Sequence, residues 1–151
     1  MKNHKVRLAV RAWVLAVITG LLATGCTDVQ VHPVDRDQSL STICIVVNPA
    51  VEVSDFVDVL RAGIARHNLA SQVVSQEASK ICQATLTYTA LRSWDMSPYL
   101  SYAELHLWRD GKPIGDATYH LRGKGGLSLE KWEGTSTKMN PVIDSLLSQY
   151  H

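Results

Sequence analysis

The sequence has 151 residues, which is enough for one domain and hardly enough for two. The formal net charge of +1 hides a segregation of charge. Residues 1–25 carry four basic side chains and no acidic one, so the rest of the chain has a net charge of −3, from 11 basic and 14 acidic side chains. A nucleic-acid-binding protein needs a basic surface that neutralises phosphates, so this balance argues against that class.

The first 25 residues have the organisation of an export signal. Residues 1–11 are basic, and residues 12–23, "AWVLAVITGLLA", are apolar and uncharged. This apolar run is shorter than the roughly 20 residues that a membrane-spanning helix needs. It suits the hydrophobic region of a signal peptide, so we expect residues 1–25 to be removed from the mature protein.

The segment "LATGC", residues 22–26, resembles the bacterial lipobox. In that kind of signal the small residues fit a peptidase cleft, and the thiolate of the cysteine takes up a diacylglycerol. The resemblance implies that Cys26 becomes the acylated amino terminus, with acyl chains such as palmitate. Two or three acyl chains hold a protein firmly at a membrane, so the protein would be anchored without spanning the bilayer. The alternatives are an uncleaved anchor helix and an ordinary signal with a chance cysteine.

The residues after the cysteine bear on the choice of membrane. Thr27 follows Cys26 directly, and the acidic Asp28 comes one place later. Bacterial sorting resembles a rule in which an aspartate directly after the cysteine retains the protein in the inner membrane. We therefore expect an outer-membrane anchor that faces the periplasm.

The mature chain is expected to begin with a lipidated tether over residues 26–41, because this stretch is polar, contains a proline and shows no sustained period. A single domain over residues 42–151 follows. It opens with "TICIVV", a β-branched apolar run that predicts a buried strand over residues 42–47.

Residues 54–67 are predicted to form a helix, because Phe56, Leu60 and Ile64 recur every four residues. Ser54 is the expected N-cap. Gly63 weakens this helix, and close packing of the helix on a sheet would explain its presence. Asn68 is expected to end the helix in a left-handed conformation.

Four more segments have the patterns of strands. A short strand is expected over residues 72–75, and a longer one over residues 81–90, where apolar side chains alternate with threonines. Residues 99–109 and 113–122 form a predicted hairpin around the Asp-Gly turn of "RDGK". Gly115 interrupts the alternation of the second hairpin strand and indicates a β-bulge.

The chain is predicted to end with a helix that starts at Asn140 and Pro141 and continues to about residue 150. The element order is then β-α-β-β-β-β-α. It predicts an α+β fold with a mostly antiparallel sheet and both helices packed on one face.

Two cysteines remain when Cys26 is used by lipid. Cys44 and Cys82 stand at the starts of apolar runs, and an even pair in an oxidising compartment favours a disulfide. The alternative is two separate buried thiols.

No pattern of catalytic or metal-binding residues stands out. His106 and His120, with Glu104 and Asp116, lie on the predicted hairpin, but no His-x-x-x-His or Cys-x-x-Cys spacing accompanies them. We interpret them as polar residues on a solvent-exposed face, and we expect no metal and no cofactor.

The second half of the chain is rich in aromatic residues. Trp94 and Tyr99 flank the "DMSP" loop, and Trp132 lies in "SLEKWEG". Tryptophan and tyrosine are enriched at protein interfaces, so these three are candidate partner-binding residues. The alternative is that they fill a thin core.

Several stretches together, among them "LATGC", "CQATLTYTALRSWD" and "YLSYAELHLWRDGKPIGDATYHLRGKGG", resemble a family of small proteobacterial envelope lipoproteins. The resemblance implies an envelope lipoprotein domain and brings no catalytic residues. We therefore expect a non-enzymatic binding or assembly accessory with an envelope protein as partner. The alternatives are a periplasmic metal-binding protein or enzyme that uses His106 and His120, and a purely structural envelope lipoprotein.

Overall fold

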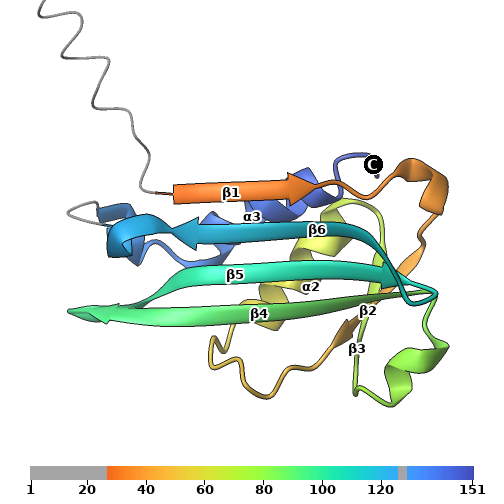
Figure 1. Cartoon of the computed structure of the whole chain (residues 1–151), viewed down its shortest axis with the longest axis horizontal. Coiled ribbons are helices and arrows are strands. Elements are labelled where there is room, and N and C mark those ends of the chain that lie inside the picture. Colours follow the sequence, from red (N-terminus) through yellow and green to blue (C-terminus); the bar gives the residue numbers. More distant parts are fainter. Residues whose placement is uncertain (1–26, 126–128) are drawn as a thin grey trace, which may run out of the picture.

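A six-stranded sheet with two α-helices on one of its faces makes up the computed structural model, which describes residues 27–125 and 129–151 (Figure 1). The strands are β1 (Thr27–His32), β2 (Thr42–Val46), β3 (Ala70–Val74), β4 (Ala84–Asp95), β5 (Ser97–Arg109) and β6 (Lys112–Leu121). The helices are α2 (Phe56–Arg66) and α3 (Thr135–Leu146), and the short 3₁₀ helices are η1 (Arg36–Gln38), η2 (Ala78–Ile81), η3 (Arg122–Gly125) and η4 (Leu129–Trp132).

The strand order in the sheet is β1-β6-β5-β4-β2-β3. Strand β2 runs parallel to both β3 and β4, and the other neighbouring strands are antiparallel. The predicted α+β class, with a mostly antiparallel sheet and both helices on one face, is confirmed.

The expected tether is replaced by a strand. Residues 27–32 form β1, which pairs with β6 along its whole length, from Thr27 opposite Leu121 to His32 opposite Asp116. Val29 and Val31 alternate with polar residues, which is the pattern of an edge strand with one face in solvent. Residues 27–32 therefore belong to the sheet, and for this stretch the prediction of a tether over residues 26–41 was wrong.

Helix α2 packs through the predicted apolar stripe, and Phe56, Leu60 and Ile64 are all buried. Its N-cap position is Asp55 rather than Ser54, and Asp55 accepts a hydrogen bond from the Thr135 hydroxyl at 2.9 Å. Asn68 follows the helix with a φ of 57°, as predicted.

The glycine of α2 faces the other helix rather than the sheet. A Cβ atom on Gly63 would lie 2.7 Å from Cγ2 of Ile143 in α3. The absent side chain therefore allows the two helices to approach each other closely, which corrects the expected contact with the sheet.

Helix α3 begins earlier than predicted, at Thr135, and it contains Pro141 in its interior. Proline has no N–H to donate to the carbonyl group four residues before it, which is that of the exposed Thr137. The buried side chains of Lys138 and Met139 extend the packed face of the helix toward its N-terminus. This packing outweighs the local preference of proline for the first turn.

The predicted hairpin between β5 and β6 is confirmed. Asp110 and Gly111 both have positive φ, as a two-residue turn of type I′ requires. The register shifts where Leu107 pairs with Gly115 and Trp108 pairs with Pro113, so the bulge lies beside Gly115 as predicted. A Cβ atom on Gly115 would lie 2.6 Å from a methyl carbon of Val34, which explains why glycine stands there.

Cys44 and Cys82 form the predicted disulfide, with their Cα atoms 6.1 Å apart. Cys44 lies in β2, and Cys82 lies between η2 and β4. Because β2 and β4 are neighbours, the bond joins segments that the sheet already holds together.

Candidate binding face

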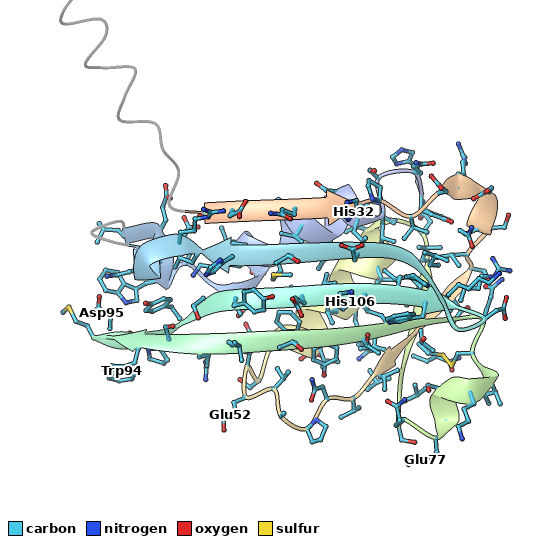
Figure 2. The ribbon with its side chains drawn as sticks, viewed as in Figure 1. His32, Glu52, Glu77, Trp94, Asp95 and His106 are labelled. Carbon is cyan, nitrogen blue, oxygen red and sulfur yellow. A yellow bond between two sulfur atoms is a disulfide. The ribbon has the colours of Figure 1, made fainter. Side chains whose placement is uncertain are left out.

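One face of the sheet is left open by the fold. Both helices lie behind the sheet in the view of Figure 1, and the side chains drawn in Figure 2 on the near face come from β1, β6, β5 and β4. The buried side chains of β4 and β5 alternate with half-buried ones, so each strand contributes every second residue to this face. We call it the open face.

The centre of the open face is a cross-strand row made by Thr87, His106, Asp116 and His32. Nδ1 of His32 lies 3.0 Å from a carboxylate oxygen of Asp116. Nε2 of His106 lies 3.8 Å from a carboxylate oxygen of Glu104, its neighbour two residues back on the same strand. Each imidazole of this row therefore has a carboxylate beside it.

The next rows toward the start of β1 carry Tyr102 and His120. The Tyr102 hydroxyl donates a hydrogen bond to Glu104, and this bond raises the pKa of Tyr102 to about 12. The ring of His120 packs edge-on against Tyr102, with ring centres 5.7 Å apart. Asp28 pairs with Arg122, and their hydrogen bond lowers the pKa of the Asp28 carboxyl group.

The structure separates the two histidines that could have formed a metal site. His106 is opposite Asp116, whereas His120 is opposite Tyr102, and the pair Glu104 and Thr118 lies between them. No three His, Cys, Asp or Glu side chains in residues 27–125 and 129–151 are grouped so that they could hold a metal ion. Sequence reasoning missed His32, because its stretch was read as a tether; the alternation of Val29 and Val31 was the signal that could have found it.

The three candidate aromatic residues lie in different environments. Trp94 is 71% exposed near the end of β4. Tyr99 is buried, and Nζ of Lys138 lies 5.5 Å from its ring centre, so a surface role for Tyr99 was a wrong prediction. Trp132 is half-buried against the core, and its Nε1 donates a hydrogen bond to the carbonyl oxygen of Asp95 at 2.8 Å.

Two hollows mark the open face. One, of about 440 Å³, is lined by Leu91, Ser93, Ser101, Tyr102, His120, Leu121 and Gly123. The other, of about 380 Å³, is at the opposite end and includes Thr85, Thr87 and Trp108. Hydroxyl, imidazole, carboxylate and aromatic groups thus stand together on a surface that can exchange hydrogen bonds with a partner.

The arrangement of strands and helices matches that of a solved protein. The fold is similar to that of PelC. The PelC structure is a dodecamer from Paraburkholderia phytofirmans, with a TM-score of 0.54 and 12% identity over 81% of this chain and 95% of that one. At this identity the likeness to PelC concerns the fold alone.

A second solved structure is less similar to this chain. It is a minor lipoprotein from Acinetobacter baumannii, 12% identical over 74% of this chain and 89% of its own, with a TM-score of 0.31. No known protein family and no curated protein sequence matches this chain.

The proposed anchor point, Cys26, lies outside the described residues, which begin at Thr27. Among the residues that are described, no helix has both the length and the apolar character needed to cross a membrane.

Proposed function

We propose that this chain is an outer-membrane lipoprotein, anchored through acylated Cys26 and facing the periplasm, that serves as a non-enzymatic accessory in envelope assembly or transport. The export signal and the "LATGC" segment support the anchor. The open face supports the binding role, and it is the observation that carries the proposal.

One face of a mostly antiparallel sheet can lie in water, so the binding role rests on the side chains that the open face presents. The helices cover only one side, and the other presents Tyr102, His106 and Trp108 among threonines on neighbouring strands. Aromatic and histidine side chains of this kind combine contact area with hydrogen-bonding groups, which is typical of interaction surfaces. A protein partner that lies across β4, β5 and β6 would use both the contact area and the hydrogen-bonding groups of these side chains.

The partner is an envelope protein, and a second copy of this chain is the first one to test. PelC, which has a similar fold, is a dodecamer. The mass of the detergent-solubilised mature protein, measured by analytical ultracentrifugation, distinguishes self-assembly from a heterologous partner.

Crosslinking in living cells, followed by purification without reductant, tests the binding role. Thr118→Arg places a long charged side chain in the middle of the open face and should abolish a specific crosslinked partner. Ser136→Arg changes an exposed residue of α3, on the helix side of the sheet, and is the matched control. An equal yield of partner from both variants would contradict binding at the open face.

The anchor is tested separately. Cys26→Ser should abolish labelling by a fatty-acid analogue and leave an unprocessed precursor. Labelling that persists in this variant would refute lipidation at Cys26.

A further inference from the structure

The hairpin of β4 and β5 ends in exposed apolar side chains. Leu91 is 52% exposed, Trp94 is 71% exposed, and Met96, at the turn itself, is 83% exposed. Leu129 of η4, the 3₁₀ helix that packs beside β5, is 77% exposed. We call these four residues the apolar tip.

The turn is built with an unusual residue. Met96 has a φ of 60°, a conformation that favours glycine and asparagine. Methionine gains nothing from this backbone conformation, and the residue is mostly exposed to solvent. Packing of the fold therefore does not account for a methionine at this turn.

Two contacts between Asp95 and the η4 helix hold the apolar tip in place. Asp95 forms an ion pair with Lys131, and its carbonyl oxygen accepts the hydrogen bond from Nε1 of Trp132. The ion pair also neutralises the charge next to the turn, which lowers the free energy needed to place this end against an apolar environment. The hairpin therefore holds Trp94 and Met96 out as a fixed projection.

The apolar tip lies at the same end of the molecule as the first residue of β1. One row of paired residues crosses the sheet from β1 to β4 and consists of Asp28, His120, Tyr102 and Leu91. From this row β4 continues to Asp95, four residues and roughly 13 Å farther. Figures 1 and 2 show the start of β1 and the labelled Trp94 at one end of the sheet.

We infer that this end of the domain rests on the bilayer and that the apolar tip lies in the lipid headgroup region beside the anchor. The inference rests on the proposed lipidation of Cys26, which is bonded directly to Thr27 at the start of β1, with no tether between them. β1 and β4 are separated by two strands, so these two strands lie roughly 14 Å apart across the sheet. Two attachment points at one end fix the tilt of the domain.

The chemistry of the tip fits lipid better than protein. Tryptophan is enriched at the level of the headgroups, where its ring meets acyl chains and its N–H meets water. Leucine and methionine around it can reach the upper acyl chains without burying an unpaired charge. A protein partner at the tip is the alternative that the experiment below detects.

Lipids brominated near the carbonyl end of the acyl chain quench tryptophan at shallow depth. The mature, full-length protein purified from membranes is reconstituted into vesicles of phosphatidylethanolamine and phosphatidylglycerol that contain such lipids. We expect strong quenching in the wild type and loss of most of it in Trp94→Phe. Trp108→Phe is the matched control, because Trp108 lies near the opposite end, across from Thr85, and should leave the quenching unchanged.

The mass of the same sample separates the two proposals. An acylated, vesicle-bound protein in which Trp94→Phe quenches like the wild type would overturn the inference and leave the anchor intact. A sample whose mass shows no acyl chains would overturn the proposed anchor. Quenching of Trp94 in that sample would still support contact of the apolar tip with lipid, and no quenching of Trp94 would refute this contact.

A photocrosslinker that replaces Met96 in living cells gives a second reading. Adducts of lipid mass support the inference, whereas a discrete crosslinked protein at this position would overturn it in favour of a protein partner.

Discussion

Opening the bond between Cys44 and Cys82 should destabilise the domain mainly through its unfolded state. The folded state does not need the bond for its geometry, because β2 and β4 pair directly, with Ile43 opposite Ala84 and Ile45 opposite Leu86. In the unfolded chain the bond closes a loop of 39 residues, counted from 44 to 82 inclusive. The chain-entropy relation gives a loss of about 4 kcal/mol for a loop of this size.

Urea denaturation followed by tryptophan fluorescence checks this number. The reduced wild type should fold to the same structure and lose about 4 kcal/mol of unfolding free energy. Its m-value should rise, because the chain without the cross-link exposes more surface when it unfolds. The Cys44→Ala/Cys82→Ala variant should lose slightly more, since Cys44 is buried and its sulfur leaves a small cavity.

Two results would refute this reasoning. A loss below about 1 kcal/mol with an unchanged m-value would show that the bond does not restrict the unfolded chain. A reduced protein that no longer folds would show that the pairing of β2 with β4 is too weak to form without the bond.

Three further predictions concern the helices. Gly63→Ala should lower the unfolding free energy by about 1 kcal/mol, because the steric overlap of the new Cβ atom with Ile143 outweighs the gain in helix propensity. In a double-mutant cycle, Ile143→Val should restore part of the lost free energy. Burial acts to raise the pKa of Asp144, but hydrogen bonds from Arg66 and His67 outweigh burial and lower this pKa. Asp144→Asn should therefore lower the unfolding free energy by less than about 1 kcal/mol at neutral pH. Urea titrations at several pH values should show that this difference from the wild type fades below about pH 4. Burial lowers the pKa of Lys138, whose Nζ donates hydrogen bonds to the carbonyl oxygens of Leu100 and Lys131. Lys138→Met should lower the unfolding free energy by about 2 kcal/mol. The wild type should gain stability toward about pH 10, because its unfolded chain still binds the proton that the folded chain releases, and Lys138→Met should abolish this gain. Exposed Lys112→Met is the control for this last variant, and a pH profile shared by all three proteins would contradict the role of Lys138.

The parts of the fold that follow from local pattern were predictable. The alternation in β4, the Asp-Gly turn and the four-residue spacing in α2 each depend on residues close together in the chain. The disulfide was predictable because an expected oxidising compartment and the pair of cysteines other than Cys26 both favour it.

The parts of the fold that depend on contacts between residues far apart in the sequence were not predictable. The alternation of Val29 and Val31 could have indicated strand β1, but its partner β6 is about ninety residues away in the sequence, so the pairing of His32 with Asp116 could not be predicted. Pro141 marks a helix start by local preference, but packing against the sheet extends α3 past it. The aromatic residues could not be divided into buried Tyr99 and exposed Trp94 until the length of the β4 and β5 hairpin was known.

The pairing of β1 with β6 also sets an order of events during folding. The first strand of the chain can complete the sheet only when the residues up to Leu121 have emerged, because its pairing partner lies there. Contacts between such distant segments form late and slowly. Under the proposed export and lipidation, β1 would have no pairing partner until β6 had emerged, which would leave the adjoining Cys26 accessible to the modifying enzymes before β1 joins the sheet.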